Sequence, residues 1–406
     1  MVGWRRAAGR LALASTLAAF FGLTIAAAHH AVPAAGRAFG GVGAPQAVAV
    51  KAKPAKKDAL ARLAEPWPDE QELAARREEA ERLSLFESDA PLPITIRADF
   101  PKINRDRTPD SPKRYAGVLE VQAEGGRIAS IPVELSTRGN ARLNVRTCSV
   151  VPLRVEFAKK DVEALNGTPF QGQRELKLVT HCGNSSIGEQ NLLVEYLTYR
   201  IFRLFTPRSY RARLVQVSYW EIGKDRAPEP RYAMFLERDA DVARRMEGRL
   251  YPIPKRLFHV LEKESLTLTA LLQYMIGNTD YSIYALHNVR LVQDRRGAVY
   301  PVSYDFDYSG LVNASYAVAD KKFEIASVRE RLYRGPCRTT EELEPFLATF
   351  RSKKAEVLAL VDAIPDLKEG RRKDAREYLE DFFEVLENPR RAKREFVDKC
   401  KTGAGM

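Results

Sequence analysis

From Pro93 onward the chain alternates apolar and polar residues in short runs, and glycine or proline residues separate these runs. A period of two is typical of strands that bury one face and expose the other. The pattern predicts an antiparallel sheet with strands at 94–98, 115–121, 128–135, 151–157 and 175–179.

Helical periodicity follows the first strands. Leu193, Leu197 and Ile201 fall on one face of a helix predicted over 189–205. The next elements predicted are a hairpin at 213–220 and 231–236, a buried helix at 266–276, and a strand pair at 288–292 and 299–304. Beyond about residue 320 the chain is rich in Lys, Arg and Glu, and helices are predicted at 341–350, 353–364, 373–387 and 392–400.

Residues 1–28 have the pattern of a secretory signal, because Arg5, Arg6 and Arg10 precede an uncharged run that ends in small residues. This run is close to the shortest bilayer span, so an uncleaved membrane anchor is the alternative, and membrane contact is expected only in that case. Either way the rest of the chain is expected to be exported, as a periplasmic or secreted protein. Residues 29–90 predict a flexible tether with one short solvated helix at 68–85.

The composition is that of a globular protein, with 45% hydrophobic and 29% charged residues. This excludes collagen-like, disordered and cysteine-framework proteins. The net charge of +12 favours anionic partners, but both signs are mixed along the chain, so no nucleic-acid partner is expected. The element order predicts an α+β domain over 91–325 followed by a helical segment over 326–406.

The four cysteines, Cys148, Cys182, Cys337 and Cys400, are an even number without CxxC spacing. Export favours two disulfides, for which three pairings are possible. We favour Cys148 with Cys182 and Cys337 with Cys400, because each pair lies within one predicted segment. His181 and Cys182 could instead form half of a metal site, but no matching Cys/His pair with zinc spacing occurs elsewhere in the sequence.

The residues that best indicate chemistry lie between 278 and 310. Asp280 follows the predicted buried helix, Asn288 opens a strand, and Asp305 and Asp307 stand where the next strand ends. Carboxylate and amide oxygens are hard ligands that suit Mg²⁺ or Mn²⁺ carrying a phosphate-bearing substrate. Each residue alone could be a turn or strand-edge residue, but their combination within about thirty residues favours a site.

With these residues, the segment 130–320 resembles the spore-coat CotH-like kinases, an atypical branch of the protein-kinase-like fold. The matching pieces are Ser136–Asn140, the strand Pro152–Phe157, the helix Asn191–Phe205 with Pro207–Ser209 after it, Tyr232–Glu237, Asn278–Asp280, His287–Asn288 and Asp305–Asp307. The resemblance implies an atypical protein-kinase-like fold with an antiparallel sheet over 91–325.

By the same resemblance, Asp280 is the catalytic acid that orients the acceptor hydroxyl, and Asn288 and Asp305 hold the metal with help from Asp307. His287 is expected to be a hydrogen-bonding neighbour. The chain has no glycine-rich phosphate loop, so side chains would have to bind the nucleotide. The candidates are Arg138, Arg154 and Lys177, with Glu237 as the acid that pairs with such a cation.

One segment departs from the family. Where the relatives have lysines and serines after the Arg-Gly motif, this chain has Ala141–Cys148, with the sequence ARLNVRTC. The surface that contacts the nucleotide is therefore expected to differ.

The predicted function is an exported kinase that transfers phosphate from ATP to a protein or cell-envelope hydroxyl with Mg²⁺ or Mn²⁺. The alternatives are a non-catalytic envelope-binding or scaffold protein, and a metal-dependent hydrolase that uses the same acids on phosphate esters.

Overall fold

The computed structural model describes residues 57–183, 185–225 and 228–403. By its internal contacts the chain divides into a unit of residues 1–51 and a unit of residues 52–406. The predicted signal over 1–28 and the predicted tether up to residue 56 lie outside the described residues. The described residues all belong to the second unit.

Seven strands of this unit close into a barrel in the order β1-β2-β3-β4-β5-β7-β6. Neighbours pair antiparallel, except that β1 runs parallel to β6. The strands are β1 (Leu92–Ala98), β2 (Tyr115–Gln122), β3 (Ile128–Thr137), β4 (Leu153–Phe157), β5 (Glu175–Val179), β6 (Ala212–Glu221) and β7 (Arg231–Leu236).

The predicted atypical protein-kinase-like fold with an antiparallel sheet is therefore wrong. The sheet is a closed, mixed barrel, and the parallel pair closes it, with Leu92 opposite Val215 and Ala98 opposite Glu221. Alternation along a strand shows which residues face the core, but it does not show which distant strand lies alongside. The strands themselves were predicted close to their observed positions.

The barrel is filled by side chains from its strands. Ile96, Leu119, Leu135, Val155 and Phe235 are fully buried in one hydrophobic cluster. The side chains that alternate with them face outward, as expected for a small barrel. The barrel interior is thus a packed core, and polar chemistry has to lie at its ends or beside it.

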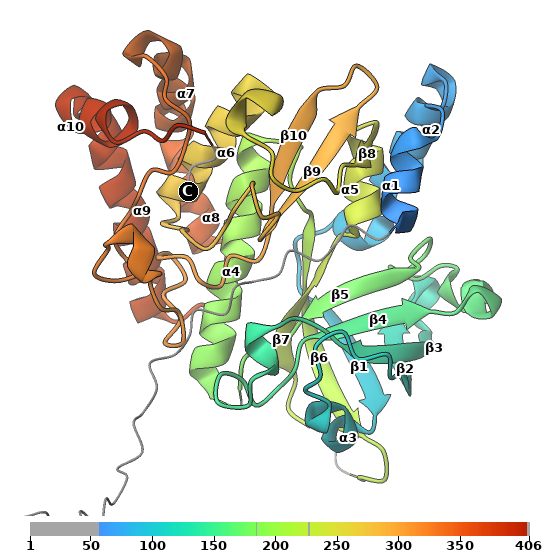
Figure 1. The fold of residues 1–406 in the computed structure, drawn as a ribbon. Coiled ribbons are helices and arrows are strands. Elements are labelled where there is room, and N and C mark those ends of the chain that lie inside the picture. The colour runs from blue at the N-terminus through green and yellow to red at the C-terminus, as the bar shows by residue number, and fades with distance from the viewer. Residues whose placement is uncertain (1–56, 184, 226–227, 404–406) are drawn as a thin grey trace, which may run out of the picture. The chain divides into compact units, whose positions relative to one another are not determined.

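Helix α4 (Ser186–Phe205) connects the barrel to the rest of the unit (Figure 1). It follows β5 and is buried over most of its surface, as a helix with apolar residues on all sides must be. Its side chains share one hydrophobic cluster with β7 residues such as Met234 and with helix residues such as Phe382. One charged residue, Glu195, is buried in this helix.

The part that follows the barrel contains a second, three-stranded antiparallel sheet in the order β10-β9-β8. Its strands are β8 (Gly248–Leu250), β9 (Val289–Asp294) and β10 (Val299–Ser303). The helices around it are α5 (Asp239–Arg245), α6 (Lys263–Met275), α7 (Thr340–Ser352), α8 (Lys354–Asp362), α9 (Glu369–Glu387) and α10 (Pro389–Lys393), which continues as a π-helical turn over Arg394–Asp398. Three helices precede or interrupt the first strands: α1 (Lys57–Ala64), α2 (Glu70–Glu81) and α3 (Phe100–Arg105).

The C-terminal helices share a core with the elements before them. Phe350, Phe382 and Phe396 are fully buried in the same cluster as residues of α4 and α6. The core therefore continues across the boundary predicted near residue 325. None of the helices in the described ranges is long and apolar enough to cross a membrane.

The predicted disulfides are confirmed. Cys148 is bonded to Cys182 and Cys337 to Cys400, and the described residues contain no free cysteine. The second bond ties the end of the chain to the segment before α7. Such bonds are compatible with an exported protein.

We expect Gly310→Ala to lower the free energy of unfolding by about 1–3 kcal/mol, since an added methyl group would overlap the Tyr378 hydroxyl of α9 and the Val328 carbonyl oxygen. Gly370→Ala in α9 is the matched control. Its methyl group meets no atom, and alanine favours the helix by up to about 1 kcal/mol. Urea unfolding of both variants measures the difference. Equal effects would contradict the packing of α9 on this loop.

Candidate functional site

The two loops that carry the predicted acids lie side by side. The backbone N–H of Gly310 donates to the carbonyl of Gly277 at 3.0 Å, and that of Leu311 donates to the carbonyl of Ile276 at 3.0 Å. These bonds join the end of α6 to the segment that follows Asp307. They bring Asp280 close to residues 305–307, which are distant in sequence.

Asp280 is the centre of a small hydrogen-bond network. Its Oδ1 lies 2.9 Å from Nε2 of His287, and its Oδ2 accepts a hydrogen bond from Nδ2 of Asn288 at 3.0 Å. Asn288 Nδ2 also donates to the backbone carbonyl of Asp280 at 2.8 Å. The bond to Asp280 raises the pKa of His287 against the effect of burial, and the charge of Asp305 adds to this. His287 is thus the hydrogen-bonding neighbour that the sequence predicted, although its bond is to Asp280.

The backbone around Asp280 is held from two sides. Asn278, which is buried, accepts a hydrogen bond from the Asp280 N–H at 3.0 Å and donates to Gln273 at 2.9 Å. Arg334 donates to the carbonyl oxygens of Thr279 and Tyr281 at 2.8 and 2.6 Å. The carboxylate is therefore fixed in place while 38% of its side-chain surface stays exposed.

The hairpin of β9 and β10 places Asn288 next to Asp305. Val289 pairs with Ser303, and the N–H of Tyr304 donates to the carbonyl of Asn288 at 3.0 Å. Asn288 and Asp305 have φ angles of 52° and 63°, in the left-handed region. Strained backbone of this kind persists where surrounding contacts hold it, and it often occurs at functional sites.

Asp305 is held by its backbone and not by its side chain. Its N–H donates to the hydroxyl oxygen of Tyr199 in α4 at 2.9 Å. Within the described residues its carboxylate makes no hydrogen bond or ion pair. Its negative charge contributes to raising the pKa values of His287 and Asp307, so these groups lie within electrostatic range of one another.

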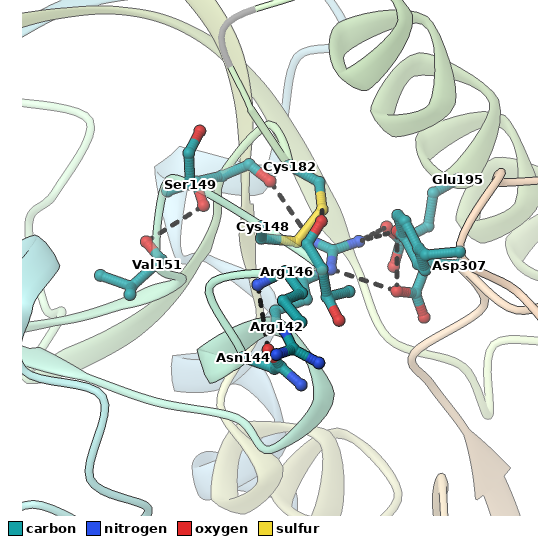
Figure 2. The surroundings of a disulfide bond; sticks show 12 residues. Arg142, Asn144, Arg146, Cys148, Ser149, Val151, Cys182, Glu195 and Asp307 are labelled. Carbon is teal, nitrogen blue, oxygen red and sulfur yellow. Dashed lines mark hydrogen bonds and ion pairs between the residues drawn. A yellow bond between two sulfur atoms is a disulfide. The ribbon is translucent and has the colours of Figure 1, made fainter.

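Asp307 has a different environment. Its Oδ2 accepts hydrogen bonds from Nε of Arg142 at 3.1 Å and from the hydroxyl of Tyr316 at 3.0 Å. Arg142 also donates to Glu195 at 3.1 Å, so one buried guanidinium serves two carboxyl groups (Figure 2).

Burial and mutual charge shift the pKa values of Arg142, Glu195 and Asp307. Burial raises the pKa of Glu195 to about 8, although Arg142 opposes the shift, and it raises the pKa of Asp307 as well. Burial acts against the charge of Arg142, but the nearby Tyr316, Asp307 and Glu195 raise its pKa well above the usual value. Arg142 is therefore a permanent cation, and burial favours the neutral form of both carboxyl groups.

Arg142 lies in the segment Ala141–Cys148, where the sequence differs from the CotH-like motifs that it otherwise resembles. The disulfide between Cys148 and Cys182 closes this segment onto the end of β5 (Figure 2). Arg142 also donates to the carbonyl of Thr180 at 3.2 Å. In this structure the segment supplies the buried cation that pairs with Asp307 and Glu195.

The predicted nucleotide-binding cations have different partners. Lys177 is paired with Asp239 at 2.5 Å, and Arg154 is paired with Glu175 at 3.2 Å. Burial lowers the pKa of Lys177 against the effect of Asp239, and the positive charge of Arg138 lowers it further. Arg138 makes no ion pair in the part of the chain that the structure describes.

Glu237 pairs with cations other than the predicted ones. It is fully buried and forms ion pairs with Arg211 at 2.9 Å and Arg245 at 2.7 Å. Arg211 in turn donates to the backbone carbonyls of Ala80 and Glu81, at the end of α2. The structure therefore places Glu237 in a network that anchors α2 to the barrel, and a role in nucleotide binding stays a prediction.

Among the described residues, no group of three or more His, Cys, Asp or Glu side chains is arranged to hold a metal ion. Asp305 and Asn288 offer a smaller set of oxygen ligands. Asp280 accepts hydrogen bonds from the side-chain nitrogen of Asn288, so the side-chain oxygen of Asn288 is left for another partner. Mg²⁺ is commonly held by one or two carboxylates together with phosphate oxygens and water. These residues fit a divalent ion that arrives with a phosphate, and they do not form a closed metal site.

Two residues of this network were not predicted as site residues from the sequence, namely Arg142 and Glu195. Glu195 could have been found, since it is the one charged residue within the apolar run from Leu192 to Leu197. A charge inside a buried helix requires a partner. Arg142 has no comparable signal, because nothing in its segment shows that it turns inward.

The comparisons with known proteins add no family. No protein-family model matches the chain, and no curated protein matches it. The function of the protein therefore has to be inferred from the geometry of these residues and from the resemblance of short motifs.

We expect Glu195→Gln to change how stability depends on pH. The pKa of Glu195 is about 8 in the folded state against an ordinary value of 4.5, so the folded state binds the extra proton between these values. The resulting stability is fully present below about pH 4.5 and is lost as pH rises toward 8. Glutamine does not titrate, so the melting temperature of the variant should rise relative to the wild type between pH 5 and pH 8.5.

Thermal unfolding monitored by circular dichroism at several pH values measures this difference. Glu163→Gln, at an exposed position, is the matched control and should follow the wild type. Parallel pH profiles for Glu195→Gln and the wild type would show that Glu195 is ionised in the folded protein.

Proposed function

We propose that the protein is an exported phosphotransferase that moves a phosphoryl group from a nucleotide to a protein or cell-envelope hydroxyl with Mg²⁺ or Mn²⁺. The observation that carries this proposal is the Asp305 carboxylate. It has no partner in the described structure, its backbone is held in the left-handed region, and it stands beside Asn288 and within range of Asp280. An unpaired acid so firmly positioned is suited to a ligand.

Asp280 is assigned the role of orienting the acceptor hydroxyl. Its oxygens already accept hydrogen bonds from His287 and Asn288, which fix the plane of the carboxylate and leave lone pairs for a further donor. A hydroxyl that donates to Asp280 would be aligned for attack and would lose its proton to this carboxylate. Phosphoryl transfer depends mainly on such positioning.

Asp305 and Asn288 are assigned as metal ligands. A bound divalent ion would neutralise charge on the phosphate oxygens. Arg138 is assigned to support the same phosphate by its charge. This assignment is supported by the electrostatic effect of Arg138 on Lys177 and on Tyr199, the residue that holds the Asp305 backbone. Asp307 is assigned to positioning, since Arg142 and Tyr316 occupy its Oδ2.

One observation favours the rival class, a protein that binds a partner without catalysis. Lys177 forms a partly buried ion pair with Asp239, and Arg290 also pairs with Asp239. Asp239 keeps its charge, because Lys177 and Arg290 lower its pKa despite burial. Lys177 is therefore already neutralised by the protein, and a nucleotide would have to rely on Arg138.

The two acids should be separable by mutation. Asp305→Asn should weaken Mn²⁺-dependent ATP binding by about tenfold or more, since loss of even an indirect support of a metal costs at least that much. Asp280→Asn should leave binding within about twofold and reduce transfer on the order of 10²-fold to 10⁴-fold, the usual contribution of a general base. Isothermal titration and transfer of labelled phosphate measure the two effects.

Asp89→Asn, an exposed acid paired with Arg200, is the matched control and should resemble the wild type in both assays. Mn²⁺-dependent binding without transfer in the wild type would favour the non-catalytic protein. Release of free phosphate without acceptor labelling would favour the hydrolase. Undiminished binding by Asp305→Asn in folded protein would refute the assignment of Asp305.

Export is part of the proposal and is supported by the N-terminal pattern and the two disulfides. A reporter enzyme fused after residue 40 should be active only outside the cytoplasm. Activity of the fusion in the cytoplasm would contradict this location.

A further inference from the structure

A cavity of about 310 Å³ lies at one end of the barrel, away from the carboxylates of the candidate site. Helix α3, the end of β6 and the segment after Cys148 surround it. Its lining is mostly apolar and aromatic, and the residues used below are Phe100, Ile103, Val150, His181 and Tyr219. Ligand sites in proteins have about this volume and this kind of lining.

Three rings line the cavity together. Phe100 and Tyr219 meet edge to face with centroids 5.3 Å apart, and Tyr219 lies 5.8 Å from the ring of His181. Aromatic rings prefer further rings as edge-to-face or offset partners. The lining therefore favours an aromatic occupant. An engineered apolar cavity of roughly 150 Å³ holds one benzene ring, so the space here suits a molecule of about two rings.

His181 is a buried polar residue whose ring packs on Tyr219 but whose nitrogens make no hydrogen bond with the described residues. It is 3% exposed, and neither ring nitrogen makes a hydrogen bond within the described part of the chain. Nδ1 is fully covered, which leaves Nε2 as the nitrogen that can meet a molecule in the cavity. The hydroxyl of Tyr219 is likewise buried without a partner among the described residues. Buried polar groups normally have partners, so the open Nε2 of His181 indicates a ligand group that can form a hydrogen bond with it.

The charges around the cavity exclude an anion as the preferred occupant. Burial and the nearby Arg231 lower the pKa of His181 to about 4, so the imidazole is neutral at physiological pH. Arg231 is itself paired with Glu189 at 3.0 Å. The lining thus offers no uncompensated positive charge.

We propose that this cavity is a binding site for a small, neutral aromatic molecule that carries a hydroxyl group, with His181 as its hydrogen-bond partner. The cavity residues do not include the proposed phosphotransferase residues, so this binding proposal does not depend on the proposed function.

The probe is 2-naphthol, which has two rings and one hydroxyl and is neutral at pH 7, with naphthalene as its matched apolar analogue. Fluorescence titration of the full chain should show saturable binding, with 2-naphthol about five to ten times tighter than naphthalene, the worth of one hydrogen bond. His181→Phe keeps an aromatic ring of similar size and should abolish this preference while still binding naphthalene.

Val150→Trp should fill the cavity and weaken binding of both probes at least tenfold, because Val150 lines it and is partly exposed. Ile128→Trp, at an exposed position outside the cavity, is the control and should bind as the wild type does. Circular dichroism confirms the fold of each variant. Absence of saturable binding by the folded wild type, binding that survives Val150→Trp, or equal affinity for the two probes would overturn the proposal.

Discussion

The structure depends on one buried cation. The guanidinium of Arg142 lies between Glu195 in α4 and Asp307 in the loop after β10, and it also donates to the backbone of Thr180. Removing one member of a buried ion pair leaves an uncompensated charge and costs about 3–5 kcal/mol. The barrel loop, the central helix and the loop that carries the acids are therefore constrained relative to one another by charge as well as by apolar packing.

This constraint explains why neighbouring acids have different roles. Asp307 is turned inward and satisfied by Arg142 and Tyr316, whereas Asp305, two residues earlier, has an unpaired carboxylate. The backbone of Asp305 is in the left-handed region, with a φ angle of 63°. Tyr199 of α4 stabilises that conformation by accepting the Asp305 N–H. Helix α4 thus supplies Glu195 and, one turn further along the helix, Tyr199, which fixes the backbone of Asp305.

Three consecutive residues after β5 connect distinct parts of the molecule. Thr180 holds Arg142 through its carbonyl, His181 lines the cavity at the barrel end, and Cys182 closes the segment that contains Arg142. The closed barrel makes this arrangement possible, since β1 beside β6 brings α3 and the end of β6 to the same side as the end of β5. In an open sheet the cavity would lack one of its walls.

The sequence by itself determined the local elements and the strand hairpin that joins Asn288 to Asp305. Periodicity reports which side of an element is apolar, and short hairpins pair with their neighbours, so these features follow from nearby residues. The disulfide pairing was favoured among three possible pairings, and the structure selected it. Closure of the barrel, the shared core of the C-terminal helices and the inward turn of Arg142 were decided only by tertiary structure. Each depends on contacts between segments far apart in the chain, and their partners leave no periodic signal. Glu195 could be predicted only in part. Its charge within an apolar run indicates that it needs a buried partner, but the sequence does not show that this partner is Arg142.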